Sequence, residues 1–216
     1  MKKTIAREET DTQKYDRLRW WAGLTFGDIL DKAADVYPEK EALIDEDGRF
    51  TYSQIRDQAD RLAIGLYDLG IGPTDRVLLQ LPNWHEFVVA YFALQKIGAV
   101  PAILIARYRQ HEIDHLTRNS GATAWIVAEK FRRTNYIPII QDVQRKNPQL
   151  THVIVCRSTT DHGYVRFEDI IENTKISAET RRRLAALRPD PNQVAHMGPT
   201  GGTTGKVDKR TLREDI

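Results

Sequence analysis

The 216-residue sequence has a single cysteine, Cys156, and almost no excess of charge of either sign. One cysteine cannot form an internal disulfide framework or a multi-cysteine zinc site, and it fits a reducing compartment. We expect Cys156 to be a buried strand residue rather than a reactive thiol. The 32 Lys and Arg residues stand against 30 Asp and Glu residues. This balance lacks the basic excess of nucleic-acid-binding proteins, so we expect no nucleic-acid partner.

The sequence also lacks a long uninterrupted hydrophobic run. Residues 1–19 mix charges of both signs, unlike a signal or transit peptide. The most apolar stretch, residues 87–106, contains Lys96, Gly98 and Pro101, and these interruptions exclude a membrane span there. We therefore expect a cytoplasmic protein with no membrane partner.

What the sequence does contain is an alternation of two hydrophobic periods. Between residues 24 and 156, stretches with a period of 3.6 alternate with short continuous apolar runs. This alternation predicts an α/β fold, in which a layered, mostly parallel sheet is flanked by helices and joined by right-handed crossovers.

Capping and turn residues place the individual elements. A hairpin is expected over residues 41–52, with its turn at Asp47-Gly48. The expected helices cover residues 25–36, 53–69, 84–97, 110–119, 138–146 and 167–173. The expected buried strands cover residues 77–81, 100–105, 124–128 and 152–156.

A glycine-rich segment near the C-terminus carries the strongest chemical signal. It consists of Thr200, Gly201, Gly202, Thr203, Thr204, Gly205 and Lys206. Glycines allow backbone amides to turn toward a phosphate, and hydroxyls and a lysine add further contacts. The Walker pattern fails, because Thr200 and Val207 stand where it requires a glycine and a Ser or Thr. Alone, the segment fits either a phosphate site or a structural turn.

Four segments together resemble the adenylate-forming ligases, the superfamily of acyl-CoA synthetases, luciferases and non-ribosomal adenylation domains. The resemblance is strongest to aryl-acid ligases of the 2,3-dihydroxybenzoate-AMP ligase type. The segments are YDRLRWWAGLTFGDIL (15–30), EALIDEDGRFTYSQIRDQADRL (41–62), VLLQLPNWHEFVVAYFALQKIGAVP (77–101) and TGGTTG (200–205).

The resemblance implies a reaction in which a carboxylate attacks the α-phosphate of ATP, giving an acyl-adenylate and pyrophosphate. It implies ATP and Mg²⁺ as cofactors, a small carboxylic acid as substrate, and CoA or a carrier-protein thiol as acceptor. By the same resemblance, residues 200–205 contact ATP, so cofactor binding falls to Thr200, Gly201, Gly202, Thr203, Thr204 and Gly205.

Beyond Gly205 the sequence departs from that pattern. The family has a variable residue, proline and lysine here, whereas this chain has Lys206-Val207-Asp208. Residues 205–213 instead resemble the family's C-terminal lysine motif, which would make Lys206 the catalytic lysine that stabilises charge developing during adenylation. We therefore expect an internally deleted ligase, joined near Gly205, that lacks most of the family's active site and has low or no activity.

This interpretation divides the chain into five segments. They are an N-terminal extension (1–23), an α/β subdomain (24–173), a polar helix and linker (174–192), a strand and phosphate loop (193–205), and a remnant of the lysine motif (206–216). Loss of later strands would expose a sheet edge, so we expect a tendency to self-associate. The alternative is a non-catalytic remnant or nucleotide-binding module.

Two other patterns suggest different chemistry. Residues 111–115, HEIDH, match the H-E-x-x-H motif of zinc hydrolases, although no third ligand is evident and the segment also fits a helix entry of the aryl-acid ligases. His85 follows a predicted strand end, where α/β sheets place ligands, so it is a candidate substrate contact. Its neighbour Asn83 is equally able to cap the next helix.

Overall fold

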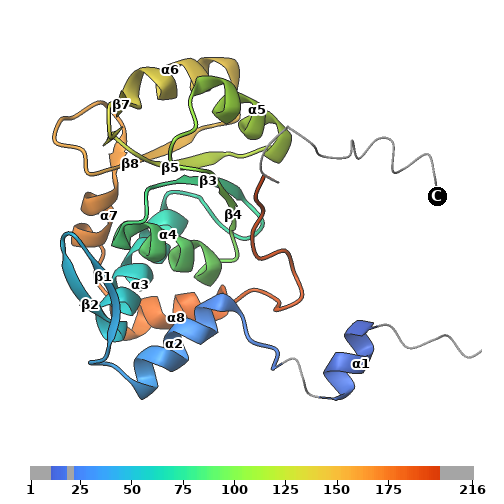
Figure 1. Ribbon diagram of the computed structural model, residues 1–216. Coiled ribbons are helices and arrows are strands. Elements are labelled where there is room, and N and C mark those ends of the chain that lie inside the picture. The colour runs from blue at the N-terminus through green and yellow to red at the C-terminus, as the bar shows by residue number, and fades with distance from the viewer. Residues whose placement is uncertain (1–10, 19–21, 200–216) are drawn as a thin grey trace, which may run out of the picture.

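The computed structural model describes residues 11–18 and 22–199, in which five parallel strands lie between two helical layers (Figure 1). The strand order is β4-β3-β5-β8-β9, and all four pairings are parallel. The predicted α/β class and parallel sheet are confirmed. The strands are β3 (Arg76–Gln80), β4 (Val100–Ile103), β5 (Ala124–Ala128), β8 (His152–Cys156) and β9 (Val165–Arg166).

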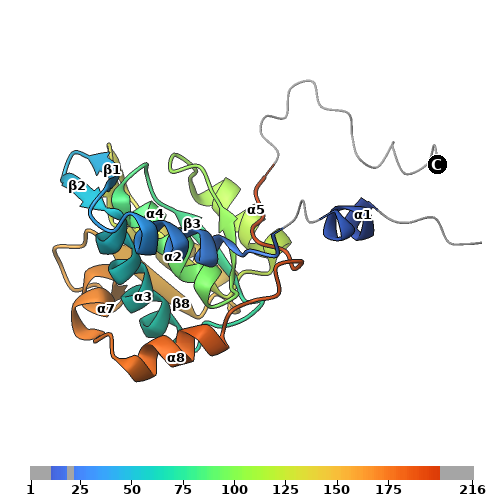
Figure 2. The same cartoon turned by 90° about the horizontal axis from the view of Figure 1, so that it is seen from below.

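Helices cover both faces of the sheet, as the two views in Figures 1 and 2 show. Successive residues of each strand point to opposite faces, so Ile126 packs in one core cluster while Trp125 and Val127 pack in the other. One face carries α2 (Phe26–Val36), α3 (Tyr52–Asp68), α4 (His85–Lys96), α7 (Phe167–Asn173) and α8 (Ala178–Ala186). The other carries α5 (Gln110–Ser120) and α6 (Ile137–Lys146), and α1 (Asp11–Arg17) precedes them all.

Two small antiparallel hairpins accompany the main sheet. The first pairs β1 (Glu41–Asp45) with β2 (Gly48–Thr51), which confirms the expected hairpin and its turn at Asp47-Gly48. The second pairs β6 (Lys130–Phe131) with β7 (Thr134–Asn135). The second hairpin and β9 have strands of two residues, too short to produce a hydrophobic period in the sequence.

Capping side chains determine where the first helices begin. Thr25 caps α2 as expected, because its hydroxyl accepts the Asp28 amide while the Asp28 carboxylate accepts the Thr25 amide. α3 begins one residue earlier than predicted, since Thr51 rather than Ser53 accepts the amide of Gln54. A cap of this kind contributes about 1 kcal/mol to stability.

The outer side of β4 is paired by a segment far along the chain. Met197 forms a parallel bridge with Ala102, in which its amide donates to the Pro101 carbonyl at 3.0 Å and its carbonyl accepts the Ile103 amide at 2.9 Å. Figure 1 shows this segment, coloured dark red, running beside β4. One bridge thus pairs the outer side of β4 at Ala102, and the expected self-association stays a prediction.

The polar stretch that was expected to be a surface helix and linker contributes to the core. α8 begins after Ser177, whose hydroxyl accepts the Thr180 amide, and its Leu184 is buried in the cluster beneath the helical face. Arg181 and Arg182 remain exposed at the margin of this packing. Among the described helices, none is both long and apolar enough to cross a bilayer.

Candidate functional site

A cleft of about 940 Å³ lies at the carboxyl ends of β3 and β4. Open α/β sheets bind their ligands at this end of the strands. Its volume is within the range of roughly 300–1,000 Å³ that small-molecule sites occupy. Three stretches dominate its lining: the β3–α4 connection (81–84), the chain from the end of β4 onward (103–107), and residues 196–199.

Aromatic side chains form one wall of the cleft. Trp84, Phe87 and Phe131 line it, and the rings of Trp84 and Phe131 meet edge to face with their centroids 6.2 Å apart. The guanidinium of Arg157 lies 3.8 Å from the centroid of the Trp84 ring. This cation–π contact holds the indole in a fixed position, so the cleft has a preformed aromatic surface.

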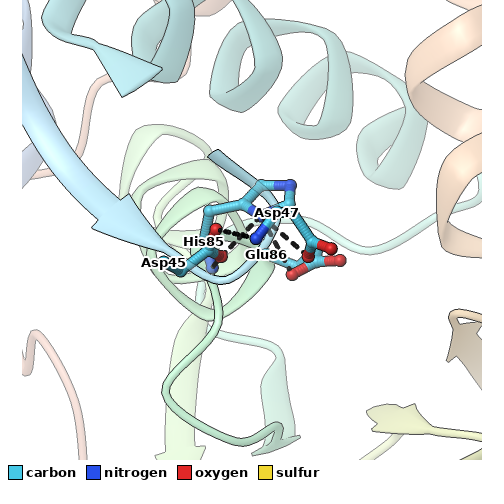
Figure 3. A group of neighbouring side chains, drawn as sticks. All are labelled: Asp45, Asp47, His85 and Glu86. Atoms are coloured by element: carbon cyan, nitrogen blue, oxygen red, sulfur yellow. Dashed lines mark hydrogen bonds and ion pairs between the residues drawn. The ribbon is translucent and has the colours of Figure 1, made fainter. Parts of the chain in front are cut away.

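Next to the cleft, four ionisable side chains converge from two elements (Figure 3). Asp45 and Asp47 come from the β1–β2 hairpin, and His85 and Glu86 begin α4. The Asp45 carboxylate accepts the backbone amide and the Nδ1 of His85, each at 2.9 Å. Because Trp84 provides no side-chain cap for α4, Asp45 supplies that cap from the hairpin.

Hydrogen bonding controls the ionisation of Asp45. Burial alone would raise its pKa, but the hydrogen bonds from the amide and side chain of His85, and from the amide of Asp47, outweigh this effect and lower the pKa to about 2. Asp45 is therefore a carboxylate at neutral pH, and its charge is committed to the hairpin and the start of α4.

Arg157 neutralises the remaining carboxylates of the group. It follows β8 with a φ of 55°, a left-handed conformation that is costly for a side chain other than glycine. Its Nε and Nη2 contact the two Glu86 oxygens at 2.6 and 2.9 Å, and Nη2 also bonds Asp47. Burial lowers the pKa of Arg157, but the contacts with Glu86 and Asp47 more than compensate and raise it.

The contacts of Arg157 with Glu86 and Asp47 leave no free ligand set for a metal ion among these side chains. The ligand atoms of Asp45, Asp47, His85 and Glu86 lie within 4.8 Å of one another. However, the Arg157 guanidinium already takes both Glu86 oxygens and an Asp47 oxygen, and a magnesium ion favours oxygen ligands that are free to coordinate. The group therefore does not fit Mg²⁺. We call Asp45, Asp47, His85, Glu86 and Arg157 the hairpin clasp, because they tie the hairpin to α4 and β8.

The structure gives His85 a role different from the predicted substrate contact. Its ring stacks on Phe50 with centroids 4.2 Å apart and bonds Asp45, and its side chain is only 15% exposed. Its neighbours Asn83 and Trp84 line the cleft instead. The strand-end rule thus located the correct loop, but the helical turn that starts at His85 directs that side chain toward the hairpin.

The zinc-like segment lies on α5, with His111 and His115 exposed. Glu112 accepts the Arg109 amide at 3.1 Å in a capping box, and His115 bonds Asn119 at 2.9 Å. In the described part of the chain, no further ligand joins the two histidines. The contacts of Glu112 and His115 are thus made within α5.

Cys156 is fully buried at the end of β8, as predicted. Burial, reinforced by the nearby carboxylates of Glu86 and Glu168, raises the pKa of its thiol far above the ordinary range. The thiol is consequently protonated and unreactive in the folded chain.

The predicted phosphate-binding segment begins where the described residues end. Gly198 and Pro199 line the cleft and lead directly into it. The candidate positions themselves lie outside the described residues; they are Thr200, Gly201, Gly202, Thr203, Thr204, Gly205 and Lys206.

Residues 30–207 match the sequence profile of the family described as AMP-binding enzyme. Over 196 residues the chain is 34% identical to a salicyl-AMP ligase / salicyl-S-ArCP synthetase of Mycobacterium tuberculosis. Over 193 residues it is 31% identical to the 2,3-dihydroxybenzoate-AMP ligase of Bacillus subtilis. The apo structure of Mycobacterium smegmatis MbtA superposes with a TM-score of 0.74 at 33% identity.

The chain therefore belongs to the AMP-binding enzyme family, and the expected resemblance to aryl-acid ligases is confirmed. The matches cover 88% of this chain for the salicyl-AMP ligase and 89% for the other two, but only 33% or 34% of those proteins. The chain thus spans about a third of the length of the relatives it matches.

Proposed function

We propose that the chain binds ATP through residues 200–205 and supports adenylation of an aryl carboxylic acid. The observation that carries this proposal is the pairing of Met197 with β4, which leads the chain past Gly198 and Pro199 into the cleft at the carboxyl end of the sheet. A glycine-rich segment that leaves a strand at this edge offers backbone amides to phosphate oxygens. The aryl-acid ligases among the relatives support the choice of acid.

In this proposal each residue has a defined task. The amides of Gly201, Gly202 and Gly205 and the hydroxyls of Thr200, Thr203 and Thr204 hold the β- and γ-phosphates. Lys206 stabilises the charge that develops on the α-phosphate as the carboxylate attacks and pyrophosphate leaves. Mg²⁺ binds together with ATP as the counter-ion of the phosphates. It is not held by the hairpin clasp. The acceptor of the acyl group is CoA or a carrier-protein thiol.

We further propose that the lysine motif follows Gly205 directly, so that two family motifs share this glycine and the adenylation activity is low. Sequencing the coding DNA across codons 200–210 tests the join. A continuous coding sequence that reads through these codons supports it. A different sequence between codons 205 and 206 contradicts it.

ATP–pyrophosphate exchange on the purified 216-residue chain tests the activity. Salicylate, 2,3-dihydroxybenzoate and benzoate are compared with a short aliphatic acid. Exchange that depends on an aryl acid and is lost in Lys206→Ala supports adenylation. The matched control is Lys175→Ala, an exposed lysine away from the cleft.

A second outcome identifies the alternative function. This alternative is a nucleotide-binding module without catalysis. ATP binding without exchange for any acid supports that alternative. Absence of ATP binding contradicts both functions.

A further inference from the structure

Residues 195–197 precede the glycine-rich segment, form an isolated β-bridge with β4 at Met197, and are held by side chains of α4. Gln95 is only 4% exposed, and its Nε2 donates to the Ala195 carbonyl at 2.6 Å, a contact that spans 100 residues of sequence. Its buried neighbours on α4 are the apolar Ala93 and Leu94 and the charged Lys96, which pairs with Asp31 and Asp60. Burying a side-chain amide costs free energy unless the amide is hydrogen-bonded. The bond to the Ala195 carbonyl therefore explains why a glutamine can be buried at position 95.

A second contact from the same helix reaches the next residue of the strand. The Tyr91 hydroxyl lies 3.1 Å from Nδ1 of His196. The ring of Phe26, from α2, packs edge to face on Tyr91 at 5.7 Å and lies 6.2 Å from His196. α4 thus contacts two consecutive residues: Gln95 bonds the backbone carbonyl of Ala195, and Tyr91 bonds the side chain of His196.

The opposite side of this short strand is held by the sheet. Met197 exchanges its two backbone hydrogen bonds with Pro101 and Ile103 of β4, and its side chain packs in the core cluster beneath α5. A shift of this extended segment by one residue would move the Met197 side chain out of the core cluster and break its bridge to Ala102. The contacts of Gln95 and Tyr91 exist in only one register.

We propose that Gln95 and Tyr91 are positioning residues for nucleotide binding: they fix residues 195–197 against β4 and so hold Gly198 and Pro199, which lead into the glycine-rich segment, at the cleft. This inference rests on the proposed function for its consequence, the binding of ATP. The register itself is a property of the described strand. The two parts are therefore tested by different measurements on the same variants.

Gln95→Met and Tyr91→Phe are the test variants, because each keeps the side-chain volume and removes one hydrogen bond. Gln58→Met, at a half-buried glutamine of α3 that does not touch the strand, is the matched control. The measurements are amide hydrogen exchange of Met197 and Ile103, the ATP dissociation constant, and the thermal midpoint of the full chain.

For Gln95→Met we expect exchange at Met197 and Ile103, and the ATP dissociation constant, to rise about three- to tenfold, the effect of one lost hydrogen bond. Amide exchange in β5 and β8 stays at the wild-type rate in Gln95→Met. In the control Gln58→Met, both the exchange at Met197 and Ile103 and the ATP dissociation constant equal those of wild type. In the pyrophosphate-exchange assay the KM for ATP rises while the KM for the acid does not. Tyr91→Phe gives a smaller change of the same kind.

Three results distinguish the possible failures. If the wild-type chain binds no ATP, the proposed function fails, while faster exchange at Met197 in Gln95→Met still supports the register inference. Equal exchange and equal ATP binding in wild type and Gln95→Met overturn the inference. Faster exchange throughout the sheet, with a matching fall in thermal midpoint, also overturns it, because Gln95 would then serve overall stability rather than the strand.

Discussion

The Asp45 carboxylate caps a helix that begins 40 residues later, by accepting both the backbone amide and the Nδ1 of His85. The turn after β1 is folded over the same carboxylate, which accepts the Asp47 amide at 2.9 Å. One side chain therefore joins the hairpin, the start of α4 and the edge of the cleft.

The pH dependence of unfolding reports on Asp45. Its folded pKa of about 2 lies below the ordinary value of 3.8, so its contribution is full above about pH 4 and is lost as the pH falls toward 2. Asp45→Asn lowers the free energy of unfolding by about 2 kcal/mol at neutral pH, and the difference from wild type shrinks below pH 4. Urea unfolding at several pH values measures this, with the exposed Glu39→Gln as control. A difference that does not change with pH would refute the assignment.

The stability of the hairpin clasp depends on the bidentate contact between the Arg157 guanidinium and the Glu86 carboxylate. Arg157→Met leaves the buried Glu86 carboxylate without its guanidinium partner and lowers the free energy of unfolding by about 3 kcal/mol. Arg157→Lys recovers only part of this, because lysine cannot form the bidentate contact. The control is Arg145→Met, which breaks an ion pair whose arginine is 73% exposed and costs about 0.5 kcal/mol or less. Denaturant titration in parallel would contradict the account if the two Met variants lost equal stability.

Cys156 reports on the integrity of β8. Because burial raises the pKa of its thiol, an aromatic disulfide reagent reacts with it only when the strand opens. The reaction, followed by absorbance, is slow in buffer and complete in denaturant. Rapid stoichiometric reaction of the folded chain would show that β8 is not packed as described.

We predict that the HEIDH segment binds neither a structural nor a hydrolytic zinc, because Glu112 is engaged in the capping box of α5. A zinc-selective chelator, added in the presence of excess Mg²⁺, therefore leaves the thermal midpoint and the ATP affinity of the wild type unchanged. Combined replacement of His111 and His115 by alanine alters neither. A chelator-induced drop in midpoint that zinc restores, and that the double variant lacks, would reinstate the zinc site.

The main elements of the fold could be predicted because each has its own local signal. Continuous apolar runs predicted the strands 124–128 and 152–156 with the bounds that the structure shows. Capping threonine and the Asp47-Gly48 turn predicted α2 and the first hairpin. These signals lie within a few residues of the structure they specify.

The contacts that shape the candidate site join segments far apart in the sequence. The pairing of Ala102 with Met197, the grip of Gln95 on Ala195 and the reach of Arg157 to Glu86 span 71 to 100 residues. No local pattern specifies such partners. For Gln95 one clue was present: a glutamine in an apolar helix requires a hydrogen-bond partner. For Arg157, only its position directly after a buried strand pointed to the carboxyl edge.

Titration of the 216-residue chain with ATP and Mg²⁺ tests the central claim most directly, by comparing wild type with Gly202→Val and with the control Lys175→Ala. The account predicts saturable binding of one ATP per chain, unchanged in Lys175→Ala and at least about tenfold weaker in Gly202→Val, since a side chain there blocks the approach of backbone amides to phosphate. Absence of saturable binding, or equal binding by Gly202→Val, would contradict the claim that residues 200–205 hold the nucleotide.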